Sequence, residues 1–487
     1  MEAESSLKKI VAHAKEYGFV FPSSEIYDGM QAVYDYGPYG TALKNNLKQV
    51  WWQCMTRLNE NIVGIDSAIF MHPTTWKASG HVDSFNDPMI DNKDSKKRYR
   101  ADTLIEDFAQ ELEAKGETDK ARQLVTEMNR LLEAENLEGI RNLIIEHSIT
   151  DPLSGTANWT DVRQFNLMFS TQSGSVADDA TQIYLRPETA QGIFVNFLSV
   201  QKTARKKIPF GIAQIGKAFR NEIVARQFIF RMREFEQMEM QFFVRPGEEL
   251  EWYEHWKDNR YRWHQAIGIR PENLNIYEHE KLAHYANAAV DIEYRFPFGL
   301  KEVEGIHSRT DFDLSAHQEY SGKKIQYFDP EINKNYVPYV VETSIGADRL
   351  FLMTLCESYR EEEVQSGDKV KTRTYLKINP ALAPMKAAIF PLVKKDGLPE
   401  KAREIFDRLK FDFDLFYEEN QAIGKRYARQ DLVGTPFCIA VDYQTLEDET
   451  VTIRDRDTMA QDRIPIAGLH QYLSERTSIA PILSAMG

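Results

Sequence analysis

Residues 217–239 read KAFRNEIVARQFIFRMREFEQME, and they form the most informative segment of the chain. A charged stretch joins two aromatic and apolar ones, which predicts two antiparallel strands connected by a loop. In strands, side chains two positions apart share a face. Arg220 and Glu222 are therefore expected to point in the same direction. The same is expected of Arg231, Arg233 and Phe235.

The arginines of this predicted hairpin suit a nucleotide ligand. Guanidinium groups bind phosphate oxygens with paired hydrogen bonds, and an aromatic ring can stack on a purine. A charged hairpin is by itself more often a solvated sheet edge, so the pattern alone leaves both interpretations open. A P-loop is not expected upstream: Gly211, Gly216 and Lys217 have the spacing, but Ala218 stands where a Ser or Thr would bind Mg²⁺. The segment also looks like a strand rather than a loop that wraps phosphate.

A second arginine segment lies downstream, where Gly346, Ala347, Asp348 and Arg349 begin an apolar helix. Together the two segments resemble motifs 2 and 3 of the class II aminoacyl-tRNA synthetases. Pro73, expected at the end of a strand that follows a long helix, fits the looser motif 1. Two arginine motifs in the right order make the resemblance specific.

The resemblance narrows to the homodimeric glycyl-tRNA synthetase family and covers nearly the whole chain. Its distinctive stretches occur in order: Gly18–Tyr27, Asp35–Gly40, Arg98–Asp102, Leu185–Phe194 and Arg309–Leu314. It implies that glycine reacts with ATP to give glycyl-adenylate and pyrophosphate, and that the glycyl group then moves to the 3′ end of tRNA(Gly). It also implies Mg²⁺ as cofactor and a homodimer in the cytoplasm, with no DNA partner.

The family's site residues carry over position by position. The glycine site matches Arg100, Glu188, Phe235, Glu239, Glu342, Ser344 and Gly346. The arginines implied to be catalytic are Arg220, which would contact the α-phosphate, and Arg231 and Arg349, which would contact the terminal phosphates. The ATP site matches Arg220, Asn221, Glu222, Phe230, Arg231, Phe235, Glu302, Val303, Gly346 and Arg349. Phe235 would stack on adenine, Glu222 would contact its edge, and Glu302 is the implied Mg²⁺ ligand.

Elementary chemistry supports an acidic site for glycine. Glycine has no side chain, so its recognition depends on the charge of its ammonium group and on walls that leave no space for a methyl group. A roomy pocket discriminates against one missing methylene by only about 1–3 kcal/mol, whereas a full pocket excludes every larger amino acid. An editing domain is then unnecessary.

The sequence departs from the family pattern at two places, one beside the substrate and one at a zinc site that several relatives have. Thr343 follows Glu342 where the family usually has proline, so the wall beside the substrate loses a rigid residue. The segment Asp91–Lys97 lacks the cysteines that several relatives have there, so no zinc site is expected. Four further histidines match no zinc motif and are expected to be ordinary core or surface residues of a helical region: His255, His264, His279 and His284.

The rest of the chain predicts an α+β fold. Aromatic and β-branched segments at irregular spacing predict a mainly antiparallel sheet flanked by helices: Phe165–Thr171, Gln182–Leu185, Phe210–Ile215, Gln237–Val244, Lys324–Phe328 and Tyr336–Glu342. Near the N-terminus we expect helices at Ser5–Val20 and Leu43–Leu58 and a strand at Asn61–Met71. A leucine-rich, charged stretch predicts a helical insertion.

Alternating elements after two prolines near residue 380 predict a separate α/β domain. Its strands are expected at Lys386–Val393, Asp412–Tyr417, Thr435–Val441 and Thr450–Arg454, and its helices at Leu398–Phe411, Ile423–Asp431 and from Ile466 onward. This part resembles the anticodon-binding module of class II synthetases. The expected domains are catalytic (1–90 and 159–380), helical insertion (91–158) and anticodon-binding (381–487).

Composition limits the classes of function. With 60 Lys and Arg against 74 Asp and Glu, the net charge of −14 argues against a general nucleic-acid coat, but a local basic surface can still bind tRNA. Candidates for such a surface are Lys425, Arg426, Arg429, Arg454 and Arg456. No apolar run is long enough to cross a membrane, and three scattered cysteines predict reduced thiols.

Two other functions compete with this interpretation. A synthetase-like protein without catalysis could serve as an accessory subunit or RNA binder, but such a protein would be expected to lose the arginines that this chain retains. A class II-like ligase could instead pass its adenylate to ammonia or another acceptor. The apparent anticodon-binding module argues against that second alternative.

Overall fold

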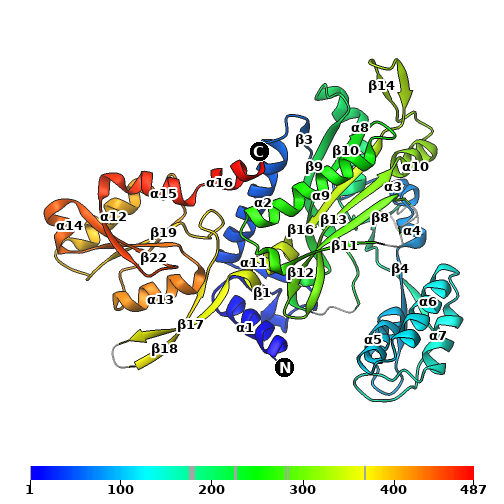
Figure 1. Ribbon diagram of the computed structural model, residues 1–487, viewed down its shortest axis with the longest axis horizontal. Coiled ribbons are helices and arrows are strands. Elements are labelled where there is room, and N and C mark those ends of the chain that lie inside the picture. Colours follow the sequence, from blue (N-terminus) through cyan, green and yellow to red (C-terminus); the bar gives the residue numbers. More distant parts are fainter. Residues whose placement is uncertain (1, 175–180, 224–226, 280–281, 283–284, 367–368) are drawn as a thin grey trace.

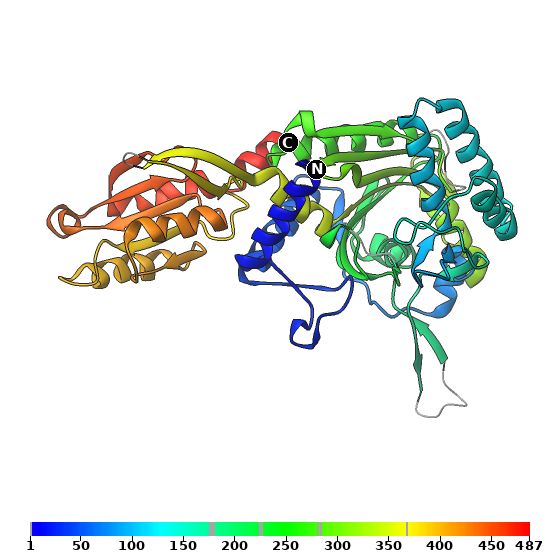
Figure 2. The same ribbon diagram turned by 90° about the horizontal axis from the view of Figure 1, so that it is seen from below.

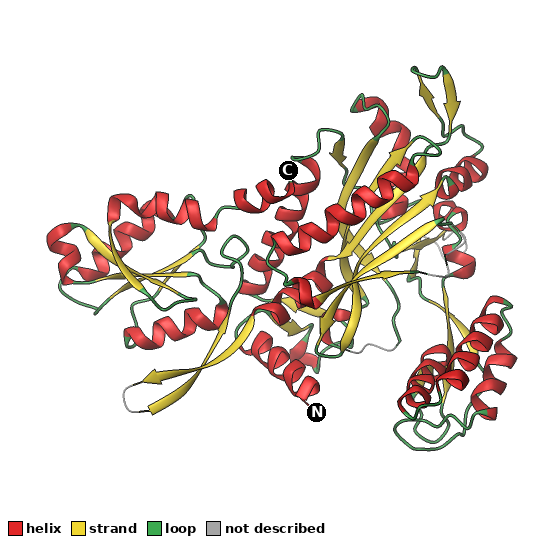
Figure 3. Cartoon of the chain, viewed as in Figure 1, coloured by secondary structure: helices red, strands yellow, loops and turns green. Residues whose placement is uncertain are grey.

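The computed structural model describes residues 2–174, 181–223, 227–279, 282, 285–366 and 369–487. They form an extended molecule with three parts (Figure 1). A large sheet with its helices lies in the middle, an α/β unit lies at one end, and a small helical unit lies beside the opposite edge of the sheet. The predicted α+β class is confirmed, since helices and sheets occur together in every part of the molecule (Figure 3) and the central sheet is mainly antiparallel.

A seven-stranded sheet forms the centre. Its order is β11-β12-β13-β16-β10-β9-β3, and all neighbouring strands are antiparallel except β3 and β9. The strands are Ile62–Gly64 (β3), Phe210–Phe219 (β9), Glu234–Val244 (β10), Leu274–Glu278 (β11), Ala288–Phe296 (β12), Gly299–Thr310 (β13) and Tyr339–Gly346 (β16). The predicted strands at Phe210–Ile215 and Gln237–Val244 are confirmed, as is the antiparallel pairing of the two.

Strand alternation gives the sheet one apolar and one mixed face. Even-numbered residues of β10, such as Met238 and Phe242, are buried in the main hydrophobic core. The helices that contribute to that core include α2 (Pro38–Thr56), α9 (Glu249–Ala266) and α11 (Ala347–Ser358). The odd-numbered residues face the other way, and Phe243 packs in a smaller core with α8 (Ala190–Thr203) and α10 (Phe312–Ser321). The remainder of that second face is polar, and it holds the site described below.

The helices and strands of the N-terminal region agree only partly with those predicted from the sequence. The first helix is α1 (Glu2–Glu16), which ends before the predicted Val20, and α2 contains most of the predicted helix Leu43–Leu58. The predicted strand Asn61–Met71 is wrong beyond Gly64, because only β3 has a ladder partner. Pro73 begins helix α3 (Pro73–Ala78) rather than ending a strand, since proline suits the first turn of a helix. The strands β1 (Val20–Pro22) and β2 (Tyr34–Tyr36) and the short helix α4 (His81–Ser84) complete this region.

A small helical unit follows. The strands β4 (Asn86–Asp91), β5 (Arg98–Arg100) and β6 (Arg163–Asn166) form its sheet, and its helices are α5 (Ala101–Ala114), α6 (Thr118–Glu133) and α7 (Leu137–Glu146). These elements share a separate hydrophobic core. The predicted strand Phe165–Thr171 is divided between β6 and β7 (Ser170–Ser173), which pairs with β8 (Thr181–Tyr184) in a projecting hairpin (Figure 2).

The C-terminal unit has its own five-stranded sheet and core. Its strands are Ala387–Pro391 (β19), Leu415–Tyr417 (β20), Phe437–Val441 (β21), Thr450–Asp455 (β22) and Gln461–Pro465 (β23), and its helices are Leu398–Leu409 (α12), Ile423–Val433 (α13), Tyr443–Asp448 (α14) and Leu469–Thr477 (α15). Every strand and helix predicted here overlaps an observed one. A hairpin of β17 (Tyr359–Ser366) and β18 (Lys369–Leu376) precedes this unit, and α16 (Ala480–Met486) returns to the main core.

Several peripheral features complete the fold. The predicted strands Lys324–Phe328 and Tyr336–Glu342 overlap β14 (Tyr327–Asp329), β15 (Lys334–Tyr336) and β16. No disulfide joins the cysteines, of which Cys54 and Cys438 are buried. His255 and His264 belong to α9, His279 follows β11, and His284 lies outside the described residues. Among the helices that the structure describes, none combines the length and the apolar character needed to cross a membrane.

Candidate functional site

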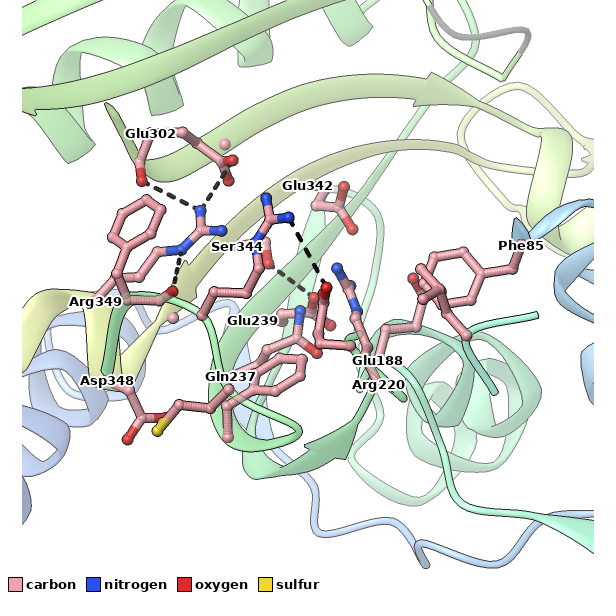
Figure 4. Close-up of a pocket in the computed structure, with 18 of the residues that line it drawn as sticks. Phe85, Glu188, Arg220, Gln237, Glu239, Glu302, Glu342, Ser344, Asp348 and Arg349 are labelled. Atoms are coloured by element: carbon pink, nitrogen blue, oxygen red, sulfur yellow. Dashed lines mark hydrogen bonds and ion pairs between the residues drawn. The ribbon is translucent and has the colours of Figure 1, made fainter. Parts of the chain in front are cut away.

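A cavity of about 400 Å³ opens on the polar part of the sheet face. The side chains that line it come from strands β10, β13 and β16, from the loop between β9 and β10, and from the region before α8 (Figure 4). Thirteen of the predicted glycine-site and ATP-site residues line this cavity: Arg100, Glu188, Arg220, Glu222, Phe230, Arg231, Phe235, Glu239, Glu302, Glu342, Ser344, Gly346 and Arg349. Asn221 and Val303 do not, and Val303 is instead buried in the main core.

Three glutamates, here called the acidic cage, face one another in this cavity: Glu188, Glu239 and Glu342. Strand alternation places Glu239 on the cavity face of β10, next to Ser344 of β16 in the register. Its two carboxylate oxygens accept hydrogen bonds from the hydroxyls of Thr189 (2.6 Å) and Ser344 (2.8 Å). No cation within ion-pair distance of Glu239 is found among the described residues.

The other two cage carboxylates each have basic side chains as partners. His81 Nε2 lies 3.3 Å from Glu188, and Gln191 donates a 2.9 Å hydrogen bond to the same carboxylate. Glu342 lies 2.9 Å from His307 Nδ1 and 3.1 Å from Arg309 Nη1. Two carboxylates of the cage are therefore compensated locally, and Glu239 is not.

This difference is reflected in the pKa values. Burial, together with the negative charges of Glu342 and Glu188, raises the pKa of Glu239 to about 8. Burial alone would also raise the pKa of Glu188, but the charge of His81 and then that of Arg309 hold it well below 4.5. Likewise, Arg309 and His307 overcome the effect of burial on Glu342 and lower its pKa.

A β-bulge brings Glu302 into the cavity. Between β12 and β13 the register shifts, so that Ile292 pairs with Glu304 and Glu293 pairs with Glu302. Val303 is the extra residue of the bulge, and in a regular strand Glu302 and Glu304, two positions apart, would share a face. Glu302 instead reaches the cavity, where it forms a 3.0 Å ion pair with Arg349.

Arg349 is held firmly at this end of the cavity. Its guanidinium stacks 4.4 Å from the ring of Phe230 and donates to the Phe230 carbonyl. The neighbouring Asp348 accepts hydrogen bonds from Tyr36 and from Lys44 (2.6 Å), and both donors belong to the N-terminal region. These contacts fix the start of α11 against α2.

The loop between β9 and β10 differs from the sequence expectation. β9 ends at Phe219 and β10 begins at Glu234, so the alternation of strand side chains does not apply to the arginines between them. The expectation that Arg233 shares a direction with Arg231 and Phe235 is wrong. Its Nε donates 2.9 Å to the carbonyl of Glu222, whereas Arg231 and Phe235 line the cavity.

Arg220 lies between two aromatic rings. Its guanidinium is 5.3 Å from the ring centre of Phe85 and 5.4 Å from that of Phe235, and its Nε donates to the carbonyl of Pro187. The charge is therefore oriented toward the cavity by contacts that leave its other N–H groups available to a ligand.

Arg100 connects the small helical unit with the cavity. It lies 3.0 Å from Asp87 and makes a two-point contact with Asp102, at 2.6 and 3.1 Å. Both partners are acidic, so this arginine is fully compensated in the structure.

Sequence reasoning gave no role to three basic side chains that contact the acidic cage: His81, His307 and Arg309. Arg309 lies in one of the stretches quoted for the resemblance, but His81 and His307 gave no periodic or spacing signal. Thr343, the departure from the family's proline, is fully buried on the opposite face of β16. It pairs with Met240 and Ile306, so it lies behind the cage rather than on its surface.

Within the described ranges, no group of three or more His, Cys, Asp or Glu side chains is arranged to hold a metal ion.

Three of the five basic residues proposed for a C-terminal surface patch are buried, so the expectation of a patch is wrong for them. Arg426 donates to the carbonyls of Pro391, Glu418 and Leu392, Arg454 binds Asp431, and Arg456 donates to the carbonyls of Gly434 and Ile378. Lys425 and Arg429 are exposed.

Comparisons with known proteins match the same family over nearly the whole chain. Residues 169–359 match the tRNA synthetase class II core domain (G, H, P, S and T), and residues 386–476 match an anticodon binding domain. Residues 87–123 and 116–167 match glycyl-tRNA synthetase insertion domain 1. The glycine–tRNA ligase of Chlorobaculum tepidum is 53% identical over 472 residues, which cover 96% of this chain and 100% of that protein. Those of Staphylococcus haemolyticus and Macrococcus caseolyticus are 53% and 52% identical, and the alignments cover 97% of this chain and 99% of each relative.

Proposed function

The chain belongs to the glycine–tRNA ligase family of class II aminoacyl-tRNA synthetases, and from this premise we propose how its residues divide the work. The enzyme attaches glycine to tRNA(Gly) and consumes ATP in doing so. One observation supports the division of roles that follows. The acidic cage and two arginines, Arg220 and Arg349, line the same cavity.

The acidic cage binds the ammonium group of glycine. Glu239 is 2% exposed and both of its oxygens are held by hydroxyl groups, so it cannot move aside to admit a larger amino acid. Glu188 and Glu342 are held as firmly by His81 and Arg309. Steric exclusion by fixed walls is the selectivity that the smallest amino acid requires.

The arginines bind the nucleotide beside the cage. Arg220 contacts the α-phosphate, where negative charge develops as the glycine carboxylate attacks, and Arg231 and Arg349 contact the terminal phosphates. Phe235 stacks on adenine and Glu222 contacts its edge. No side-chain nucleophile is needed, since positioning and charge neutralisation account for catalysis in phosphoryl-centred reactions.

The residues present are compatible with Mg²⁺ delivered together with ATP. The side chain of Glu302 is 47% exposed at the arginine end of the cavity, and Mg²⁺ usually binds one or two carboxylates together with substrate phosphates. When bound, the ion would neutralise phosphate charge. Glu302 would hold the ion, and Arg349, which pairs with Glu302 in this structure, lies at the same end of the cavity as the cation proposed for the phosphates.

The remaining features concern the whole molecule. We propose that residues 1–90 and 159–380 form the catalytic domain, 91–158 the insertion and 381–487 the anticodon-binding domain, with Lys425 and Arg429 as the remaining candidates for RNA contacts. A homodimer in the cytoplasm is proposed from the resemblance. Light scattering at several protein concentrations tests it, since a dimer has twice the 56.4 kDa mass of one chain.

Exchange of pyrophosphate into ATP tests the activity. We expect exchange with glycine and none above background with alanine or serine, followed by charging of total tRNA with glycine alone. An accessory protein would give no exchange. A ligase with another acceptor would give exchange without charging.

A further inference from the structure

A chain of buried hydrogen bonds reaches the acidic cage from outside the cavity lining. Helices α8 and α10 pack against each other (Figure 1), and Gln191 of α8, which is fully buried, bonds to two side chains of α10. Its side-chain nitrogen donates to Glu188 at 2.9 Å and to Asp313 at 3.0 Å. Its side-chain oxygen lies 2.8 Å from Nε2 of His317. The amide therefore uses both of its ends, and one end holds a carboxylate of the cage.

The chemistry of the amide fixes the direction of each bond in this chain. Ionised carboxylates only accept, and Asp313 is paired with Arg309, so the nitrogen of Gln191 must face the two carboxylates. Its carbonyl oxygen then faces His317 and can only accept, so Nε2 of His317 carries a hydrogen. A neutral ring meets this requirement, and burial lowers the pKa of His317, which favours the neutral ring. The contact thus depends on one N–H group and not on the charge of the imidazole.

Helical spacing places two residues of α10 where they meet this amide. Asp313 and His317 are four positions apart, so they lie on the same face of α10, toward α8. Asp313 also binds Arg309 by two contacts, at 2.8 and 3.1 Å, and Arg309 lies 3.1 Å from Glu342. The amide is therefore linked to a second carboxylate of the cage. Glu239 is held by the two hydroxyl groups described above.

We propose that His317 and Gln191 are positioning residues for glycine: the N–H group of His317 fixes the Gln191 amide, which in turn holds Glu188 in place for the substrate ammonium. The inference rests on the proposed assignment of Glu188 to glycine. A buried polar group that loses its partner costs more free energy than a hydrogen bond contributes. Without the histidine donor, the amide would rotate toward another donor, and Glu188 would lose one of its bonds.

A second cavity allows this bond to be tested without overfilling the core. It has a volume of about 690 Å³, and His317 lines it together with residues of α3, α8 and α10. Glutamine and methionine are both unbranched, flexible and of similar length, so either can use this space. Only glutamine has a terminal N–H donor that can replace Nε2 of histidine. His317→Gln and His317→Met are therefore a matched pair.

Glycine-dependent pyrophosphate exchange measures the outcome. His317→Met should raise the KM for glycine roughly tenfold, because a buried hydrogen bond behind Glu188 is lost. The KM for ATP and kcat should change by less than about threefold. His317→Gln should keep all three constants within about threefold of the wild type, because it restores the donor. If both substitutions raise the KM for glycine equally, His317 matters only for packing, and if neither raises it, the hydrogen bond is dispensable; either result would overturn the proposal.

A double-mutant cycle tests whether His317 acts through Gln191. Gln191→Met removes the amide and should raise the KM for glycine at least as far as His317→Met does. Adding His317→Met to Gln191→Met should then change the KM for glycine by less than about threefold. Effects that multiply would show that His317 influences glycine by another route, and the proposal would be wrong. If His317→Met does not fold, an unchanged KM for glycine in folded Gln191→Met gives the same contradiction.

Two further variants separate the possible failures. His470→Met replaces an exposed histidine of α15, 3.2 Å from Asp412, and should leave the KM for glycine unchanged. Glu188→Gln tests the assignment beneath the inference. If Glu188→Gln raises the KM for glycine and His317→Met does not, the role of His317 is wrong and the proposed function stands. If neither changes it, Glu188 itself is misassigned and the inference falls with it.

Discussion

Two buried clusters of ionisable side chains lie on opposite faces of strand β13, and they differ in how their carboxylates are paired. On its cavity face lies the acidic cage, and on its other face lies what we call the core ion cluster, Arg260, His264 and Glu304, in which every side chain is fully buried. Glu304 has a partner on each oxygen: Arg260 Nε at 2.6 Å and His264 Nε2 at 2.8 Å. In the core ion cluster the single carboxylate is paired with Arg260, and burial lowers the pKa of His264, so charges balance without a ligand. In the acidic cage three carboxylates lie close together, and one of them, Glu239, has no cation within ion-pair distance among the described residues.

The comparison separates stability from binding. A buried ion pair is tolerated when the partners satisfy each other, and breaking it leaves a costly unpaired charge. A carboxylate without a cation costs free energy in the empty protein, and that cost is recovered when a cationic ligand arrives. The core ion cluster should therefore matter for folding, and the acidic cage for glycine.

The largest effect is expected from Arg260→Leu, which removes the main cation of the core ion cluster. Glu304 would remain buried without its closest partner, so the free energy of unfolding should fall by about 3–5 kcal/mol. Denaturant unfolding measures it. Arg262→Leu, an exposed position of the same helix, should change stability by no more than about 0.5 kcal/mol. Equal effects of the two substitutions would contradict a structural role for the core ion cluster.

On the cavity face, Arg220→Ala should leave the fold intact and lower pyrophosphate exchange by about 10²–10³-fold, since a fixed charge at the reacting phosphate is lost. Exchange kinetics and a thermal melt measure both quantities. Arg57→Ala, an exposed arginine at the end of α2, is the matched control and should change neither. An Arg220→Ala enzyme that is both folded and active would show that Arg220 does not have the proposed catalytic role.

Glu239→Gln and Glu304→Gln sharpen the comparison, because the same substitution on opposite faces should have opposite effects on stability. The pKa of Glu239 is raised from 4.5 to about 8, so between these values the folded protein holds a proton that the unfolded chain has lost. Stability therefore falls as the pH rises through this window, and Glu239→Gln removes that loss.

At pH 8 the unfolding temperature of Glu239→Gln should equal or exceed that of the wild type, while its KM for glycine should rise roughly 10- to 100-fold. Glu304→Gln should lower the unfolding temperature at the same pH, because the buried Arg260 loses its carboxylate and the ring of His264 loses a hydrogen-bond partner. Melts of both variants between pH 5 and pH 8 measure the difference. If both variants had a lower unfolding temperature at pH 8, both clusters would stabilise the fold, and the contrast between them would be wrong.

Sequence predicted the members of the acidic cage but not its charge balance. The arginine motifs and the strands β9 and β10 have strong local patterns, so Arg220, Phe235 and Glu239 could be placed on them. Strand β13 reads as a charged segment, and the bulge at Val303 is invisible in its alternation. The face of Glu302 and of Glu304 therefore follows from the register with β12, which only the folded sheet defines.

The same limit applies to isolated residues. His81 lies about a hundred positions from Glu188 in the sequence, and their contact depends on how α4 packs against the region before α8. The buried arginines of the C-terminal unit looked like an exposed patch for the same reason: composition records that Arg426 is charged, but not that three backbone carbonyls accept its hydrogen bonds.

The smallest expected effect is the release of protons when glycine binds. The number of protons released tests the protonation of the acidic cage directly. In the free enzyme the raised pKa of Glu239, about 8, keeps this carboxyl protonated at pH 7. The ammonium of glycine stays charged at that pH and needs a carboxylate opposite it, so binding should release close to one proton. Glycine titrations in phosphate and in Tris, which differ in ionisation enthalpy, measure the number calorimetrically. The count should fall toward zero by pH 9, and Glu239→Gln should release none. Binding without proton release at pH 7 would mean that Glu239 is already ionised in the free enzyme, and proton uptake would mean that another group near glycine gains a proton; either result would contradict a Glu239 that must lose its proton to meet the ammonium group.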